Sequence, residues 1–502
     1  MTPVGTEPLA PSPSLSPDPL RDPASYRDPA SYRDPSGFVY RRDGRLLRQV
    51  NSSYAPHWDA LVERGLLTEL VDRGLLIPHE PVDTSLAAEP GAHAVIAPEP
   101  VSFVSYPYEW TFGELRDGAL LTLEAERLAM EAGFTLKDAS AYNVQFQRGR
   151  PILIDTLSFE TAKPGEPWIA YRQFCQHFLA PLALMAYRDP RCGLLLRDFI
   201  DGLPLDLTSR LLPGRTRLNF GLLSHIHLHA RAERRFAGQL TGTNREGTPA
   251  EGRRGPRMGP TRLAALIDGL RRSTASLRWE PSGTEWADYA EHTSYAEAAA
   301  ADKDRTVEAM LRASGGRRVW DLGANTGRFS RIAAAAGCDV IAFDIDPGAA
   351  ERHYRVVREA GEEHILPLVA DIAAPSPGLG WAGAERRSLL ERTDADLVLA
   401  LALVHHLAIS RNVPLQSISA LFARLAPEAI VEFVPKADPM VRFLLSSRED
   451  VFPDYTIDGF RAAFDRDFEA VAEVPIEGSP RTLFHLRRRE GATPLESPTA
   501  RA

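Results

Sequence analysis

Residues 319–327 read Val-Trp-Asp-Leu-Gly-Ala-Asn-Thr-Gly, and a second acidic segment, Ile-Ala-Phe-Asp-Ile-Asp-Pro, follows at 341–347. The first segment predicts an apolar strand that ends in Asp321 and turns through two glycines into a helix. The second predicts a strand over 339–343 that ends at Asp344. Glycine lets the backbone pass close to a ligand, and an acid at the tip of the next strand can accept both hydroxyls of a ribose. The pair therefore predicts a ribose-containing ligand at the edge of an α/β sheet.

This spacing resembles the first motif of the class I S-adenosylmethionine-dependent methyltransferases, which reads acid, any residue, glycine, three residues, glycine. Asp321, Gly323 and Gly327 occupy those places. A dinucleotide-binding fingerprint would carry a glycine where this chain has Asn325, and its helix N-terminus would face a pyrophosphate. Asp321 would repel a phosphate but suits a cationic amino-acid ligand. The alternative is a glycine turn in another doubly wound domain.

The resemblance implies a role for each residue of the donor site. Asp321, Gly323 and Gly327 would hold the methionine part of S-adenosylmethionine, with Asn325 in the same loop, Asp344 the ribose and Asp371 the adenine. Further strands are expected at 365–370, 397–403 and 429–434, and an antiparallel pair at 468–474 and 482–486. Together they outline a Rossmann-like seven-stranded methyltransferase sheet, and the resemblance covers residues 285–489.

Candidate catalytic residues follow the fourth and fifth of these strands, at the ligand edge of an open sheet. They are His405, His406, Glu432 and Lys436. Methyl transfer mainly requires alignment of nucleophile, methyl and sulfur, and a base is needed only when the acceptor is a hydroxyl or a protonated amine. Either histidine could remove a proton near neutral pH. The alternative is a packed histidine that only hydrogen-bonds a neighbouring loop.

Lysine is rare in this chain, with four lysines among 58 basic residues. A lysine that survives such a bias suggests a need for a compact ammonium that arginine cannot imitate. Lys436 follows the fifth strand, and Lys303 lies in a helix expected over 293–312. Chance survival of surface lysines is the alternative.

The connection between Asp371 and the fourth strand is long, which is typical of a lid or an acceptor pocket. A helix is expected over 384–392. Trp381 is either a stacking platform for the acceptor or a buried anchor.

A second globular region, residues 36–237, precedes the methyltransferase region. A capping box, Thr-Phe-Gly-Glu at 111–114, predicts a helix that runs to residue 131. Asp138, Asn143 and Asp155 then resemble the catalytic loop and the metal-binding acid of the protein-kinase and aminoglycoside-phosphotransferase superfamily. In that family the first Asp accepts the hydroxyl proton of the acceptor, and the Asn and second Asp hold magnesium with ATP.

The departures from that superfamily are substantial. Leu136 stands where a histidine is expected, and no glycine-rich loop or lysine-bearing strand precedes it. A degenerate α+β kinase-like domain is therefore expected, and turn formation by Asp138 and Asn143 is the alternative. Three alternating histidines, at 225, 227 and 229, would line one side of a strand like metal ligands. The stretch 222–235 instead predicts a helix that spreads them over the surface, so no metal site is expected.

Five segments are thus expected along the chain. They are a disordered tail at 1–35, the kinase-like domain at 36–237, a linker or mobile loop at 238–260, the methyltransferase domain with a helical lead-in at 261–489, and a second tail at 490–502. The formal net charge of −9 does not indicate a nucleic-acid surface. Three cysteines without a C-x-x-C pair fit a reducing cytoplasm, and neither a signal peptide nor a membrane span is expected.

The arrangement of the whole chain resembles a bacterial family that includes a nodulation-associated protein of rhizobia. The prediction is a cytoplasmic methyltransferase that uses S-adenosylmethionine and acts on a small-molecule or saccharide acceptor. Two alternatives remain open. One is an ATP-dependent phosphotransferase acting through the N-terminal region, and the other is a non-catalytic S-adenosylmethionine-binding protein.

Overall fold

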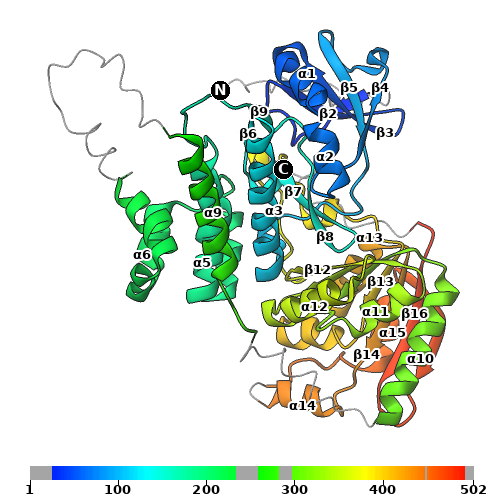
Figure 1. Cartoon of the computed structure of the whole chain (residues 1–502). Coiled ribbons are helices and arrows are strands. Elements are labelled where there is room, and N and C mark those ends of the chain that lie inside the picture. Colours follow the sequence, from blue (N-terminus) through cyan, green and yellow to red (C-terminus); the bar gives the residue numbers. More distant parts are fainter. Residues whose placement is uncertain (1–24, 233–257, 282–296, 447–448, 492–502) are drawn as a thin grey trace, which may run out of the picture. The chain divides into compact units, whose positions relative to one another are not determined.

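The computed structural model describes residues 25–232, 258–281, 297–446 and 449–491 (Figure 1). Most of both predicted tails and of the linker 238–260 lies outside these ranges. The chain forms two compact units, one of residues 1–64 and 77–100 and the other of residues 65–76 and 101–502. This division falls inside the region 36–237, and the kinase-like assignment of that region stays a prediction.

The first unit is an antiparallel sheet with one main helix. Its strand order is β1-β2-β3-β5-β4, with β1 (Ser25–Arg27), β2 (Gly37–Arg42), β3 (Arg45–Asn51), β4 (His79–Val82), β5 (Ala92–Pro98) and helix α1 (Ala55–Glu63). Strands β2 and β3 form a hairpin, and its turn residues Asp43 and Gly44 both adopt the positive φ angles that such a turn requires. Phe38, Tyr40 and Val95 form its core.

The second unit begins with the helices α2 (Leu66–Asp72) and α3 (Phe112–Glu131) and two small antiparallel sheets. In one, β6 (Phe134–Leu136) pairs with β9 (Phe159–Thr161), and in the other, β7 (Val144–Gln147) and β8 (Arg150–Leu153) form a hairpin. The predicted capping box of α3 is confirmed. The Thr111 hydroxyl accepts the Glu114 N–H at 3.2 Å, and the Glu114 carboxylate accepts the Thr111 N–H at 2.7 Å.

Short helices follow, interrupted by π-helical turns: α4 (Tyr171–Phe174), α5 (Ala180–Tyr187), α6 (Leu205–Leu211), α7 (Phe220–Leu222) and the longer α9 (Pro260–Ser276). The expected surface position of the alternating histidines is wrong for two of them. His225 is buried and bonded to the Tyr171 hydroxyl at 2.9 Å, and His227 is buried and bonded to the Ser209 hydroxyl at 2.8 Å. The π-helical turn 223–228 directs both rings toward neighbouring helices.

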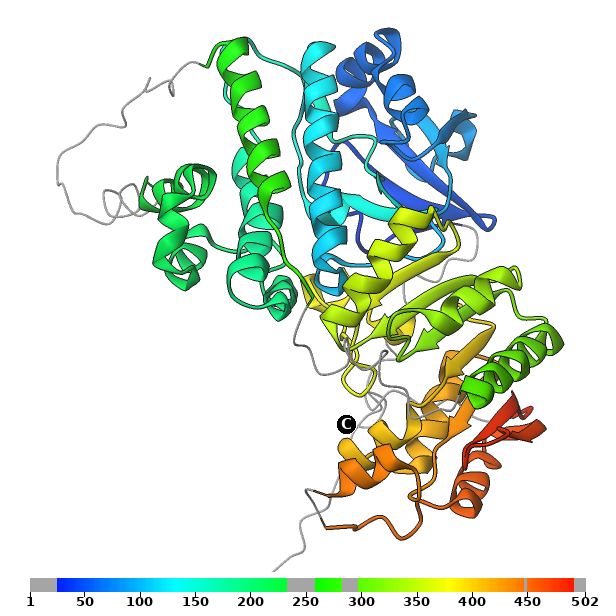
Figure 2. The same ribbon diagram turned by 60° about the horizontal axis from the view of Figure 1, so that its bottom comes forward.

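The methyltransferase sheet is confirmed, with seven strands in the order β12-β11-β10-β13-β14-β16-β15 (Figure 2). Its strands are β10 (Arg318–Leu322), β11 (Asp339–Asp344), β12 (Ile365–Val369), β13 (Leu397–Ala400), β14 (Glu428–Phe433), β15 (Phe468–Pro475) and β16 (Thr482–Arg488). All neighbours pair in parallel except β16, which is antiparallel to both β14 and β15. The central strand β13 is buried along its whole length, which accounts for its continuous apolar sequence.

Helices alternate with these strands: α10 (Glu297–Ser314), α11 (Arg328–Ala335), α12 (Pro347–Ala360), α13 (Leu415–Leu425), α14 (Pro439–Leu445) and α15 (Ile457–Phe464). The prediction of a helix over 384–392 is wrong. Only two 3-10 turns form there, at Trp381–Gly383 and Leu389–Glu391, because Gly380, Ala382 and Gly383 adopt positive φ angles and an isolated bridge ties Leu379 to Arg386. The Trp381 side chain is exposed, so it is not a buried anchor.

The N-terminal part of the second unit packs against the strands that carry the first motif. The Phe103 ring lies edge-on to Trp320 at 5.8 Å and to Phe343 at 6.2 Å between ring centroids. Glu109 and Arg392 form an ion pair whose side chains are both almost fully buried, with one N–H···O distance of 2.9 Å. Segments separated by hundreds of residues thus share one core. No helix in the described ranges is long and apolar enough to cross a bilayer.

Candidate functional site

A cavity of about 640 Å³ lies at the carboxyl edge of the parallel strands. Its wall includes five of the six predicted donor-site residues: Asp321, Gly323, Asn325, Asp344 and Asp371. Gly327, the sixth, is the N-cap of α11 at the end of the same loop. The structure therefore brings together residues from three separate strand ends at the edge where open α/β sheets bind ligands.

The loop after β10 has a backbone conformation that explains its residue types. The N–H groups of Gly323 and Ala324 both donate to the Phe343 carbonyl, at 2.8 and 3.0 Å, which fixes the loop against β11. Asn325 has φ of 51° and Gly327 has φ of 82°. Asparagine tolerates this left-handed region and glycine adopts it without steric cost. The loop is thus held beside the cavity by these two hydrogen bonds and by residue types that tolerate positive φ angles.

Asp344 ends β11 inside the cavity and is almost fully buried. Its two carboxylate oxygens accept the N–H groups of Asn325 and Asp346, each at 2.8 Å. Burial raises the pKa of Asp344 to about 6, although these backbone hydrogen bonds act in the opposite direction. The carboxylate is held in one orientation and retains lone pairs that can accept hydroxyl groups.

Asp321 lies at the other side of the glycine loop and is also buried. The Ser330 hydroxyl donates to its carboxylate at 2.6 Å. Burial raises the pKa of Asp321 to about 6, Ser330 opposes this, and the neighbouring Asp344 raises it further. A cationic ligand here would stabilise the ionised carboxylate, since an opposite charge at short range favours the charged form.

Asp371 follows β12 at the outer part of the cavity. Its carboxylate accepts the Ala373 N–H at 2.9 Å and forms an ion pair with Arg411 at 3.0 Å. Both Asp371 and Arg411 line the cavity wall.

The two predicted histidines line the same cavity, with 4.1 Å between their ring centroids. Burial, the neighbouring His406 ring and the nearby Arg481 and Lys303 together hold the pKa of His405 well below its usual value. Burial lowers the pKa of His406 to about 4. The Nδ1 atom of His405 is buried and has no hydrogen-bond partner among the residues that the structure describes. Both rings are therefore neutral at pH 7.

Glu432 and Lys436 are placed differently from the two histidines. Glu432 is fully buried behind the cavity wall, where it pairs with Lys303 Nζ at 2.6 Å and with Arg481 at 3.3 Å. The cavity is lined by these two partners rather than by Glu432 itself. Lys436 does not line it either, because its ammonium donates to Asp450 at 2.7 Å and to the Phe452 carbonyl at 2.6 Å.

Sequence reasoning missed Arg481 as a cavity residue. Its guanidinium is buried, joining Asp438 at 2.7 Å to Glu432. No local signal identified it, since arginine is the common cation of this chain. Lys303 had been singled out by the rarity of lysine, and its ammonium also lies 4.7 Å from the centre of the Phe329 ring.

Asp138, Asn143 and Asp155 are also brought together by the structure. The Asn143 amide donates to the Ser158 hydroxyl at 3.3 Å, and that hydroxyl donates to Asp155 at 2.5 Å. Asp138 accepts the Ser140 N–H at 3.0 Å and the Gln173 amide at 2.8 Å. Within the described ranges, no group of three or more His, Cys, Asp or Glu residues could hold a metal ion. The phosphotransferase role of these residues stays a prediction.

The strand order, the single antiparallel strand between β14 and β15, and the acid–glycine loop at the cavity define a class I S-adenosylmethionine-dependent methyltransferase. The chain belongs to the family of the nodulation protein NoeA of Rhizobium meliloti (strain 1021). The two share 35% identity over 460 residues, which cover 91% of this chain and 94% of that protein. No protein-family model matches the chain.

Several solved structures share parts of the fold at low similarity. The N-methyltransferase NodS from Bradyrhizobium japonicum WM9 is 14% identical, covers 39% of this chain and 98% of its own, and has a TM-score of 0.28. Magnesium protoporphyrin IX methyltransferase (ChlM) from Synechocystis PCC 6803, with bound SAH, is 18% identical. It covers 38% of this chain and 84% of its own, with a TM-score of 0.27. WbdD is 16% identical and covers 42% of this chain and 46% of its own, with a TM-score of 0.30. Because these TM-scores are low, the fold is assigned from the strand order of this chain's own sheet.

Proposed function

We propose that the cavity beside β10 and β11 binds S-adenosylmethionine and that the protein transfers its methyl group to a small-molecule acceptor. The arrangement of Asp321 and Asp344 on two sides of the glycine loop is the observation that carries this proposal. The first carboxylate would pair with the ammonium of the methionine part and the second would accept the ribose hydroxyls. Asp371 would lie near the adenine.

The acceptor would enter beside His405 and His406. For a hydroxyl acceptor, its oxygen forms the new bond to the methyl carbon while the bond from sulfur to that carbon breaks, and the hydroxyl proton passes to a neutral histidine. The positive charge lost from sulfur thus appears on an imidazolium. Both rings are neutral before the reaction, as a base must be. Glu432 would hold Lys303 and Arg481 in the wall and would not itself take the proton.

The acceptor we propose is a small molecule or a saccharide intermediate. The name of the rhizobial relative, a nodulation protein, supports this choice. A screen of saccharide acceptors with methyl-labelled donor would test it. A protein that only senses S-adenosylmethionine would bind the donor but would transfer no label to any acceptor.

Replacing Asp344 with alanine is expected to weaken S-adenosylmethionine binding by about 100-fold, because two hydroxyl-accepting oxygens and the anchor of the Asn325 N–H are lost together. Calorimetric titration of both proteins with the donor measures this effect. Asp339→Ala, at the exposed opposite end of the same strand, is the matched control and should bind as the wild type does. Failure of the folded wild type to bind would contradict the proposal.

Donor affinity is also expected to depend on pH. The donor should bind the ionised form of Asp321, whose pKa is about 6 in the free protein, so affinity should fall by up to about tenfold per pH unit below 6 and level off above it. Asp321→Asn should weaken binding at pH 7.5 and make this slope shallower. Equal wild-type affinities at pH 5 and 7.5 would contradict the assigned role.

The raised pKa of Asp321 also affects the stability of the free protein, which should change with pH in the opposite direction to donor affinity. A carboxyl group whose folded pKa lies above its unfolded value of 3.8 favours the folded state most while it is protonated. The contribution of Asp321 to the free energy of unfolding should therefore decrease as the pH rises from about 4 to about 6. Donor binding should offset this loss, because it supplies the opposite charge.

A further inference from the structure

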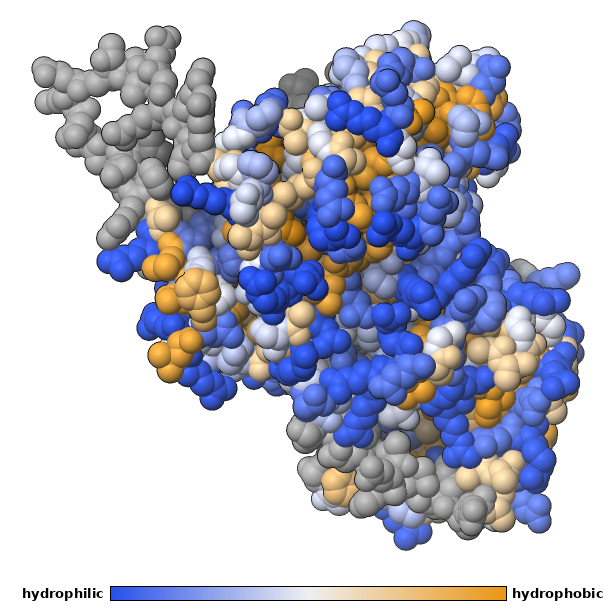
Figure 3. Space-filling model, in the orientation of Figure 1, coloured by the Kyte–Doolittle hydropathy of each residue, from blue (hydrophilic) through white to orange (hydrophobic). Residues whose placement is uncertain are grey.

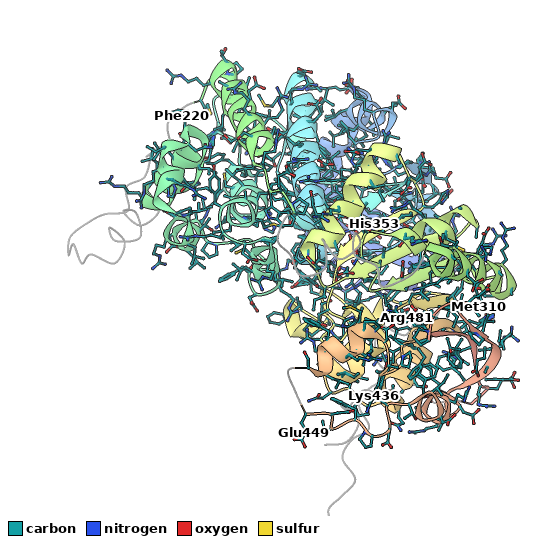
Figure 4. The ribbon with its side chains drawn as sticks, turned by 90° about the horizontal axis from the view of Figure 1, so that it is seen from below. Phe220, Met310, His353, Lys436, Glu449 and Arg481 are labelled. Carbon is teal, nitrogen blue, oxygen red and sulfur yellow. The ribbon has the colours of Figure 1, made fainter. Side chains whose placement is uncertain are left out.

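An apolar surface protrudes from the second unit, far along the chain from the donor-site motifs. Its four large side chains are Leu211, Leu218, Phe220 and Leu228, which we call the apolar tip. Leu218 is 89% exposed and Phe220 is 83% exposed. Figure 3 shows hydrophobic residues gathered over the region of α6, and Figure 4 places Phe220 at the edge of the molecule. Large exposed apolar side chains gathered over one region in this way mark an interaction site.

The backbone beneath the apolar tip is well anchored. The Thr216 hydroxyl donates to the Pro213 carbonyl at 2.7 Å and is bonded to the buried His227 ring at 2.9 Å. The Asn219 side chain accepts the Leu222 N–H at 3.1 Å, which caps α7. Gly221 packs so closely on α9 that an added Cβ would lie 2.0 Å from the Ser273 hydroxyl oxygen. Leu218 and Phe220 are thus displayed by an ordered scaffold.

The stretch of chain between Asp206 and Glu233, which carries the apolar tip, holds charged residues of one sign. Residues 207–232 contain four arginines and neither Asp nor Glu, whereas the whole chain has a net charge of −9. These arginines are Arg210, Arg215, Arg217 and Arg231, and all four are exposed. Arg210 pairs with Asp206 just outside the stretch. A basic and apolar surface on an acidic protein therefore needs a partner that is both negatively charged and able to take up apolar side chains.

We propose that the apolar tip docks on an anionic lipid surface, with Leu218 and Phe220 inserted among the headgroups and the arginines facing the lipid phosphates. Basic residues beside exposed Leu and Phe are the combination that binds peripheral segments to membranes. A second copy of this chain fits less well, because a twofold contact through the same patch would oppose arginines to arginines. The proposal does not depend on the methyltransferase reaction.

The test is co-sedimentation of the full chain with phosphatidylcholine vesicles that contain or lack phosphatidylglycerol. Wild-type protein should bind only the vesicles with phosphatidylglycerol, and less at high salt because screening weakens the arginine contacts. The double variant Leu218→Ser/Phe220→Ser should bind at least about tenfold more weakly. Arg215→Gln/Arg217→Gln should lose the preference for anionic vesicles. Val62→Ser is the matched control, since this exposed valine lies in the first unit and should leave binding unchanged.

Three outcomes would overturn the proposal. The wild type could fail to bind anionic vesicles, it could bind neutral vesicles equally well, or the double variant could bind as the wild type does. The oligomeric state of both proteins is measured by sedimentation in the absence of lipid. A wild-type dimer that the double variant cannot form would assign the apolar tip to a second copy instead. Because all the altered side chains are exposed, thermal unfolding should be nearly unchanged in every variant.

Discussion

Replacing Glu432 with alanine should lower the free energy of unfolding by about 3–5 kcal/mol, which is the cost of leaving buried charges without their partner. Glu432 is fully buried, and its carboxylate contacts both Lys303 and Arg481, whose side chains are nearly as buried. Arg481 would retain Asp438, whereas Lys303 would lose its buried ion pair with Glu432. Urea denaturation of the wild type and the variant measures the change.

An exposed pair provides the control for this experiment. Arg461 and Glu473 form an ion pair at 2.6 Å with both side chains partly in solvent, so Glu473→Ala should cost less than about 1 kcal/mol. The double variant Lys303→Met/Glu432→Leu should be more stable than Glu432→Ala, because it removes the lysine together with its counter-ion. If Glu432→Ala unfolded at the same denaturant concentration as the wild type, the buried network would contribute nothing to the fold.

The cavity wall around the first motif, the proposed donor half of the site, could be predicted from sequence because its determinants are local. The acid before Gly323, the glycine turn and the acid that ends the next strand all follow from short segments whose strand ends must meet at one sheet edge. Asp321 and Asp344 accordingly line the cavity where the motif places them. The capping box at Thr111 was equally readable, because its hydrogen bonds join residues three positions apart.

The other features of the site and the fold depend on contacts between residues far apart in the chain. Glu432 was expected at the acceptor side, but its place behind the wall is set by Lys303, which lies 129 residues earlier. The buried pair of Glu109 and Arg392 joins the N-terminal region to the long connection after β12, and no periodicity indicates it. The burial of His227 likewise depends on helices packed around a π-helical turn, which propensity does not predict.

Gly327→Ala should be among the most damaging single substitutions in the proposed donor site. Gly327 has φ of 82°, and an added Cβ would lie 2.0 Å from Nε2 of His353, a buried ring on α12 (Figure 4). The positive φ costs about 1–2 kcal/mol for alanine, and overpacking against a buried ring adds about 1–3 kcal/mol. We expect the free energy of unfolding to fall by the sum of these costs, and S-adenosylmethionine binding to weaken about tenfold or more as the loop shifts.

Two further variants separate the steric clash from the backbone strain. Gly337 has φ of 90°, but an added Cβ would meet no atom within 4 Å, so Gly337→Ala should show only the backbone cost. Adding His353→Ala to Gly327→Ala removes the ring that the methyl group would strike. The donor affinity of this double variant should then exceed that of Gly327→Ala, although the new cavity costs stability of its own. Equal losses of stability in Gly327→Ala and Gly337→Ala would mean that the His353 ring moves aside at no cost in free energy. The rigidity of the loop would in that case come from its hydrogen bonds to the Phe343 carbonyl rather than from its contact with α12.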